Sequence, residues 1–158
     1  MIGDPRMEEN YWGAPQNFRG YRPCYELSTL APGSEIAADT VSALAAIAMY
    51  IRQVEPNSQE YTTSLIVHAV NLYNFAKSRP GSYATSFRTL QTGVKNSYPS
   101  SGYYDELALA ACWLYYVTND DEYLMDAERF YHSDRSMAEL PLNMVVKLRG
   151  YFFNLIYF

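Results

Sequence analysis

The feature that most constrains the fold is an alanine-rich apolar stretch between two helix boundaries, PGSEIAADTVSALAAIAMYIRQVEP at residues 32–56. Alanine has the highest helix propensity of all residues, and Pro56 cannot continue a helix. Ser34 is a favourable N-cap, and Glu35 suits the positive N-terminal end of the helix dipole. Because apolar residues cover nearly the whole circumference over residues 36–51, we expect a long helix that is buried on several sides.

Three further segments have helical patterns of their own. Apolar residues recur at i, i+3, i+4 and i+7 between Tyr61 and Ala76, and Pro80–Gly81 ends this pattern. Two more apolar runs follow, and the short polar segment Thr118–Asp120 separates them. The sequence therefore predicts four helices, at residues 34–55, 57–79, 105–117 and 121–132.

The segments between these helices are irregular in composition. Proline and glycine interrupt residues 1–33 too often for a long helix, although the stretch is rich in aromatic residues. Residues 82–104 form a second loop, with a short helical turn expected around 86–91. No strand is expected before the C-terminal tail, so the fold class is all-α. Successive helix pairs favour a solenoid or a toroid of helical hairpins, and no fixed-period repeat is present.

Charge and composition exclude several partners. The 158 residues suit a single domain, and the net charge of −5 argues against a nucleic-acid partner. The N-terminus lacks the apolar core of a signal peptide, and Lys147 and Arg149 interrupt the short apolar C-terminus, so we expect no membrane segment. Cys24 and Cys112 have no metal-site spacing, and they either pair or remain free.

Four segments together carry a family resemblance: IGDPRMEENYWGAPQ, PGSEIAADTVSALAAIAMYIR, LIVHAVNLYNFA and YPSSGYYDELALAACWLYYVTNDDEYL. In this order they resemble glycoside hydrolase family 9, the inverting endoglucanases that fold as an (α/α)6 toroid. The resemblance implies that residues 1–131 are a partial catalytic domain of helical hairpins, and that 132–158 are a divergent tail of unknown structure. It also implies that His68 packs in the core of the toroid rather than at a functional site.

The function implied by the resemblance is that of a fragment of a secreted endo-β-1,4-glucanase acting on cellulose or related β-1,4-glucans. Such an enzyme needs two carboxylates on opposite sides of the scissile bond. The family's paired-aspartate motif and its distant acid glutamate have no counterpart in this sequence. We therefore assign no catalytic residue and expect the 158-residue chain alone to be inactive. The alternative is a non-enzymatic glucan-binding or helical interaction remnant.

The resemblance suggests two substrate-binding residues. Trp12 stands in the family's Trp-Gly-x-Pro loop beside the sugar cleft, and Tyr98 matches a tyrosine that borders the same cleft. For both residues, simple packing against the toroid is the alternative. The sequence departs from the family pattern at Glu9, where relatives usually carry a sugar-binding histidine, and at Gln16, where they commonly carry glutamate.

The pair Asp105–Glu106 raises the question of catalysis or metal binding. Helix N-termini stabilise carboxylates as anions, and adjacent helical residues diverge by about 100°, so we do not expect a catalytic pair. Oxygen donors are the ligands that calcium prefers. The resemblance implies that Ser101, Gly102, Asp105 and Glu106 hold a structural calcium ion. The alternative is that Asp105 is a plain helix N-cap.

Overall fold

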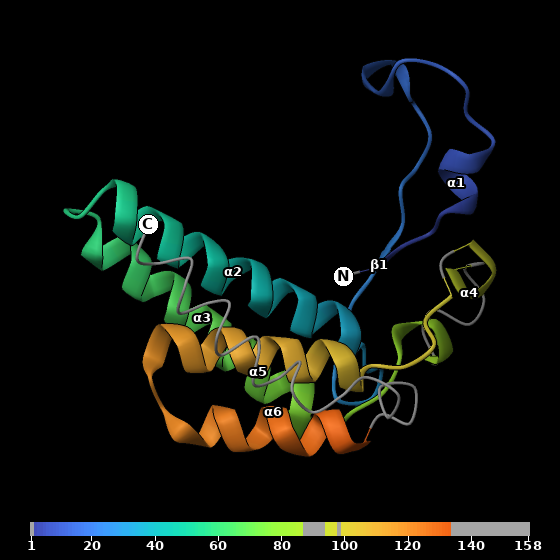
Figure 1. Cartoon of the computed structure of the whole chain (residues 1–158). Coiled ribbons are helices and arrows are strands. Elements are labelled where there is room, and N and C mark those ends of the chain that lie inside the picture. Colours follow the sequence, from blue (N-terminus) through green and yellow to red (C-terminus); the bar gives the residue numbers. More distant parts are fainter. Residues whose placement is uncertain (1, 87–93, 98, 134–158) are drawn as a thin grey trace.

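Four long helices, arranged as two successive hairpins, make up the body of the molecule (Figure 1). The computed structural model describes residues 2–86, 94–97 and 99–133. Within the first hairpin α2 contacts α3, within the second α5 contacts α6, and α2 also packs against α5. The all-α prediction is confirmed. The long helices are α2 (Ser34–Val54), α3 (Gln59–Ser78), α5 (Tyr104–Thr118) and α6 (Asp121–Ser133).

The helices end where the sequence predicts, but two of their starts differ. Helix α5 ends at Asn119, which adopts the left-handed conformation (φ 58°) typical of a C-terminal cap. Ser34 is not an N-cap: its hydroxyl donates to the Ala76 carbonyl at 2.8 Å and accepts from the Gly81 amide at 3.1 Å. It therefore links the start of α2 to the end of α3. Asp105 is not an N-cap either, because Tyr103 occupies that position before α5.

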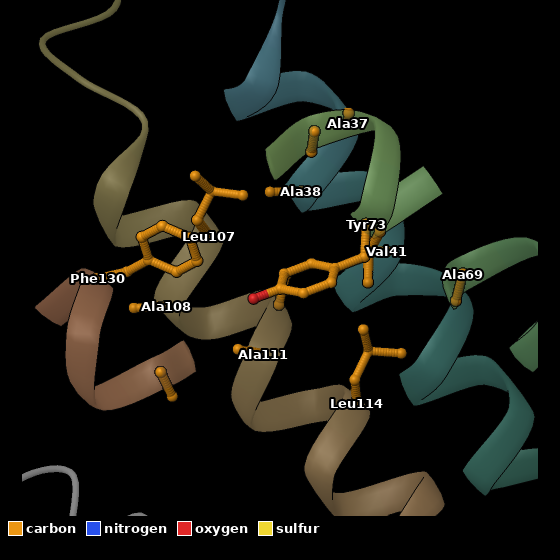
Figure 2. Packing of buried hydrophobic residues seen from close by; sticks show 13 residues of the cluster. Ala37, Ala38, Val41, Ala69, Tyr73, Leu107, Ala108, Ala111, Leu114 and Phe130 are labelled. Atoms are coloured by element: carbon orange, nitrogen blue, oxygen red, sulfur yellow. The ribbon is translucent and has the colours of Figure 1, made fainter. Parts of the chain in front are cut away.

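Alanines and a few large side chains form the core between the helices. Tyr73 of α3 is fully buried, and Figure 2 shows its ring between Val41 of α2 and the two α5 leucines, Leu107 and Leu114. The small side chains of Ala38, Ala45, Ala69, Ala110 and Ala111 are fully buried around them. Close-packed interiors tolerate few voids, so the alanines set how closely the helices approach.

The outer face of α2 is exposed, although the sequence predicted a helix buried on several sides. Ile47 and Tyr50 are 47% and 65% exposed, so α2 is buried on the face toward α3 and α5 and not on several sides. His68 of α3 is exposed as well, and the expectation of a core histidine is wrong for the described chain. Both differences have the same physical reason: no described element packs against the outer face of α2 or against the face of α3 that carries His68. Helix α2 is long and apolar enough to cross a membrane by length and composition alone, a test that core helices also pass.

The segment before α2 forms an arm that stands apart from the helices (Figure 1). Contrary to expectation it contains strands: β1 (Ile2–Gly3) pairs antiparallel with β2 (Cys24–Tyr25). The chain between them returns to its own start, so the pairing satisfies backbone groups that a loop would leave open. The arm also holds the one-turn helix α1 (Arg6–Glu9) and the 3-10 turn η1 (Pro15–Asn17).

The loop between α3 and α5 contains two short turns. These are η2 (Tyr83–Thr85) and α4 (Val94–Ser97), which lie on either side of the helical turn expected around 86–91. Residues 87–93 lie outside the described structure, so that expectation stays a prediction.

A buried polar cluster joins α3 to α6. The Asp126 carboxylate accepts hydrogen bonds from the Tyr73 hydroxyl at 2.9 Å and from Lys77 Nζ at 2.9 Å. Arg129 adds a third hydrogen bond at 2.7 Å. Burial, and then the negative charge of Asp126, raise the pKa of Tyr73, which therefore remains a donor. The cluster satisfies the one polar atom that Tyr73 carries into the core.

Candidate functional site

An aromatic loop within the arm presents the first candidate binding residue. The rings of Tyr11 and Phe18 meet edge to face with centroids 5.1 Å apart, and the Tyr11 hydroxyl donates to the Ala14 carbonyl at 3.0 Å. The Arg22 guanidinium lies 4.4 Å above the Phe18 ring, which is a cation–π contact. The loop is therefore folded on itself and does not depend on the helices.

Trp12 projects from this loop and is fully exposed, at 102% of its reference area. Packing against the helices, the alternative for this residue, does not occur within the part of the chain that the structure describes. An exposed tryptophan on an ordered loop offers a large apolar face to a ligand. Tyr98, the second candidate, lies outside the described residues and stays a prediction.

A hydrogen bond connects the neighbourhoods of these two aromatic residues. Ser97 Oγ of α4 donates to Glu9 Oε1 of α1 at 2.5 Å. Glu9 precedes Trp12 by three residues, and Ser97 directly precedes Tyr98. The arm and the loop before α5 therefore meet at the two segments that the sequence suggested for substrate binding.

Beside this contact lies a cavity of about 770 Å³ between the arm, η2 and α4. Sequence reasoning missed it, because its walls come from separate segments of the chain that extend from Ile2 to Val94. Its lining includes the buried Asp4, whose pKa is lowered by a hydrogen bond from the Arg6 side chain. Arg6 also forms an ion pair with Asp4 at 2.6 Å.

The pair Asp105–Glu106 lies at the start of α5, as predicted, but its electrostatics differ from the expectation. Burial, followed by the hydrogen bond and the negative charge of the neighbouring Asp105, raises the pKa of Glu106 to about 8. The expectation that the helix N-terminus keeps this carboxylate anionic is therefore wrong. Burial outweighs the helix dipole here, because Glu106 Oε2 is buried and has no hydrogen-bond partner in the described structure.

The acidic pair can be tested for its fit to a calcium ion. Two adjacent carboxyl groups with a buried, unpartnered oxygen are a suitable start for a cation site. The Ser100 hydroxyl, which donates to the Gly102 carbonyl at 2.6 Å, shapes the loop that carries Ser101 and Gly102. Among the described residues, no group of three or more His, Cys, Asp or Glu side chains is placed to hold a metal. The fit is therefore partial, and hydroxyl and carbonyl oxygens must supply further ligands.

Glu35 of α2 is a second buried acid near this loop. From the sequence it was expected only to interact with the helix dipole. Glu35 of α2 is 3% exposed, and its Oε1 accepts the Tyr83 amide at 2.8 Å. Burial raises its pKa, while the hydroxyls of Ser82 and Ser100 act in the opposite direction. Glu35 therefore connects α2 to η2 and to the loop before α5. The upward direction of this pKa shift could have been foreseen only from the tertiary contacts.

The two cysteines are free and lie in different surroundings. Cys24 is exposed on β2 and lines the cavity, whereas Cys112 is half-buried in α5. Burial raises the pKa of the Cys112 thiol. The question left open by the sequence is thus answered for the described structure: the two cysteines do not pair.

Antiparallel helical hairpins, with an arm and loops gathered at one end of the helices, place this protein in the class of α/α proteins (Figure 1). A family model described as Glycosyl hydrolase family 9 matches residues 1–152. This protein belongs to glycosyl hydrolase family 9. The match extends beyond Tyr131 into the segment 132–158, so the domain boundary expected at 131 stays a prediction.

Curated relatives agree with this assignment. Endoglucanase 10 of Arabidopsis thaliana is 36% identical over 124 residues, which cover 78% of this chain and 22% of the relative. An endoglucanase of Dictyostelium discoideum is 37% identical over 133 residues, covering 84% of this chain and 18% of the relative. The chain therefore spans about a fifth of the length of these relatives.

Solved structures show the same fold. The endoglucanase of the termite Nasutitermes takasagoensis superposes with a TM-score of 0.73 at 38% identity, over 83% of this chain and 29% of that chain. The cellulase Cel9M of C. cellulolyticum in complex with cellobiose superposes with a TM-score of 0.71 at 30% identity, over 87% of this chain and 29% of that chain. The helical hairpins are part of an (α/α)6 barrel, as predicted.

Proposed function

We propose that this chain forms part of the glucan-binding wall of an extracellular endo-β-1,4-glucanase, and that alone it binds β-1,4-glucan without hydrolysing it. Trp12 and Tyr98 are the proposed contact residues. The observation that carries the proposal is the full exposure of Trp12 on a loop held by its own aromatic contacts. Aromatic side chains with little conformational freedom are effective binding residues because little entropy is lost when a ligand covers them. Secretion is part of the proposal through the family resemblance.

The proposed lack of hydrolysis rests on where the carboxyl groups lie. Inverting glycosidases place an acid and a base about 6.5–9.5 Å apart, with room for a water molecule. Among the described residues, three acids have raised pKa values: Glu35 and Asp39 near the start of α2, and Glu106 at the start of α5. None of them lines the cavity, and Glu106 interacts with its neighbour Asp105. Of the two carboxylates that do line the cavity, Asp4 is paired with Arg6 at 2.6 Å, which supports the proposed lack of hydrolysis.

Replacing Trp12 tests glucan binding. In affinity electrophoresis through hydroxyethylcellulose, we expect the wild-type chain to be retarded and Trp12→Ala to lose about tenfold in affinity, because a central tryptophan contributes more than about 1.4 kcal/mol to binding. Tyr61→Ala is the matched control, since Tyr61 is 58% exposed on α3. A wild-type chain that migrates unretarded would contradict the proposal and favour the helical interaction remnant. Reducing sugar released by the pure chain would contradict the proposed inactivity.

We also propose that Ser101, Gly102, Asp105 and Glu106 bind calcium. When bound, the ion would supply positive charge to the acidic pair and crosslink the loop to the start of α5. The chain's own contribution is the buried, unpartnered Glu106 oxygen and the bend held by Ser100. A site of this kind is structural and takes no part in bond cleavage.

Calcium is expected to raise the thermal midpoint of the chain. At 100-fold excess over Kd, binding adds about 2.7 kcal/mol, which corresponds to roughly 5–10 °C for a chain of this size. Glu106→Gln should lose most of this shift, whereas Glu128→Gln, at an exposed position on α6, should keep it. Melting followed by circular dichroism with calcium and with EDTA provides the measurement. Equal shifts in both variants would point to unspecific binding and would refute the site.

A further inference from the structure

Helix α2 carries a stripe of small and apolar residues on the face that points away from α3 and α5. The stripe recurs at alternating spacings of three and four residues, which places its members on one side of a helix. It consists of Thr40, Ala43, Ile47, Tyr50 and Val54. All five are exposed, and Ile47, Tyr50 and Val54 retain 47%, 65% and 50% of their accessible area. Figure 1 shows α2 along one edge of the helical body, with the arm joined only to its N-terminal end.

No charged side chain interrupts the α2 stripe. Residues 40–51 are all uncharged, and Asp39 and Arg52 bound them. Exposed apolar surface of this kind marks contact sites for other macromolecules. The chain covers 29% of the termite endoglucanase, so the other helices of the barrel are not available within it to cover the stripe. Among the described residues, no element covers it either, because α2 packs against α3, α5 and η2 on its other sides.

The sizes of the side chains make the α2 stripe complementary to itself. Thr40 and Ala43 are small, whereas Ile47 and Tyr50, one or two turns further on, are large. In an antiparallel pair of α2 helices with a two-fold axis near residue 45, Thr40 faces Tyr50 of the second copy and Ala43 faces Ile47. Every such contact joins a small side chain to a large one, as close packing of two helices requires. A parallel pair would set Tyr50 against Tyr50 and Ala43 against Ala43.

The charges at the two ends of the stripe favour the same orientation. In the antiparallel pair, Asp39 of one copy lies at the same end as Arg52 of the other, and the opposed helix dipoles attract. A parallel pair would bring the two Asp39 carboxylates to one end and the two Arg52 guanidinium groups to the other, and like charges weaken association. Three half-exposed large side chains per copy form a small contact compared with stable dimers, so the association is weak and concentration-dependent.

We propose that two copies of this chain associate through the α2 stripe as an antiparallel, two-fold symmetric dimer. The same surface is used by both copies, so the contact closes on itself and leaves no further stripe for a third copy. Trp12, Asp105 and Glu106 are not part of the stripe, so the inference is independent of the proposed glucan and calcium binding.

Sedimentation velocity of the full 158-residue chain tests the dimer. Between about 2 and 200 µM we expect a shift from monomer to dimer, as for a micromolar dissociation constant. Ile47→Glu places a charge at the centre of the contact and should weaken the association by about tenfold or more. Val67→Glu, at a position that is 52% exposed on α3, is the matched control and should dimerise as the wild type does. Both positions are exposed, so circular dichroism should show unchanged helix content.

Chemical crosslinking tests the orientation. Thr40→Cys and Tyr50→Cys are made as separate variants, each combined with Cys24→Ser because Cys24 is exposed. When the two variants are mixed, a short bismaleimide linker should join one to the other about fivefold more often than it joins either to itself. The reason is that only the antiparallel pair brings position 40 beside position 50 of the second copy.

Several results would overturn the inference. A chain that stays monomeric at about 200 µM would show that no second copy binds, and would leave residues 134–158 or the helices of a longer polypeptide as the cover of α2. Equal weakening by Ile47→Glu and Val67→Glu would place the contact elsewhere, and predominant crosslinking of each variant to itself would exclude the antiparallel pair. Species that grow beyond the dimer would exclude a two-fold contact, because such a contact closes.

Discussion

Replacing Asp126 with alanine is expected to lower the free energy of unfolding by about 3 kcal/mol, the range found when one partner of a buried ion pair is removed. Asp126 is 6% exposed and accepts from Tyr73, Lys77 and Arg129. Its loss leaves the buried Tyr73 hydroxyl without an acceptor and deprives Lys77 of its shorter ion pair, at 2.9 Å; the 3.5 Å contact to Glu122 remains. Urea unfolding followed by circular dichroism measures the change.

Two further variants separate the contributions to this cost. Glu128→Ala, at an exposed position on the same helix, should change stability by less than about 0.5 kcal/mol. Tyr73→Phe in the Asp126→Ala background removes the orphaned hydroxyl, so it should recover part of the loss. A small effect of Asp126→Ala together with no recovery would mean that water reaches the cluster and satisfies Tyr73.

Leu114→Ala is expected to destabilise the chain by about 3 kcal/mol, within the range for leucine truncation in a core. Leu114 is fully buried in α5 and lies next to the Tyr73 ring (Figure 2). The alanine-rich surroundings have short side chains that cannot extend into the space, so the site can relax only slightly. The midpoint of urea unfolding, with the slope unchanged, reports the loss.

Leu109→Ala on the same helix is the matched control for this prediction. Leu109 is 41% exposed, so its truncation removes far less buried surface and should cost under about 1 kcal/mol. Equal losses for Leu109 and Leu114 would show that the two faces of α5 are equally buried in solution. That result would indicate that another surface, from a second copy or another chain, covers α5.

The helices could be predicted from the sequence because their signals are local. Pro56 and Pro80 end helices whatever the tertiary surroundings. The apolar spacing that predicts α3 likewise depends only on the residues of that helix. The roles of Ser34 and Glu35 could not be predicted in this way. Each side chain has the right type for a helix start, yet each bonds instead to a segment more than 40 residues away.

The features of the candidate site also fall into those that the sequence could predict and those that depend on tertiary contacts. The exposure of Trp12 was one of two alternatives that the sequence left open, since an aromatic residue suits both packing and binding. The pKa of Glu106 was predicted in the wrong direction, because the helix dipole is visible in the sequence whereas burial is not. The cavity depends on the meeting of α1 with α4, and no local pattern encodes that contact.

The two hydrogen bonds of the Ser34 hydroxyl bear on how the molecule opens. Because the same oxygen donates to the Ala76 carbonyl and accepts from the Gly81 amide, the start of α2 cannot separate from the end of α3 without breaking both bonds. The Gly81 amide proton can therefore exchange with solvent only when the junction opens. The hydrogen-exchange rate of this amide therefore reports how often the start of α2 separates from the end of α3.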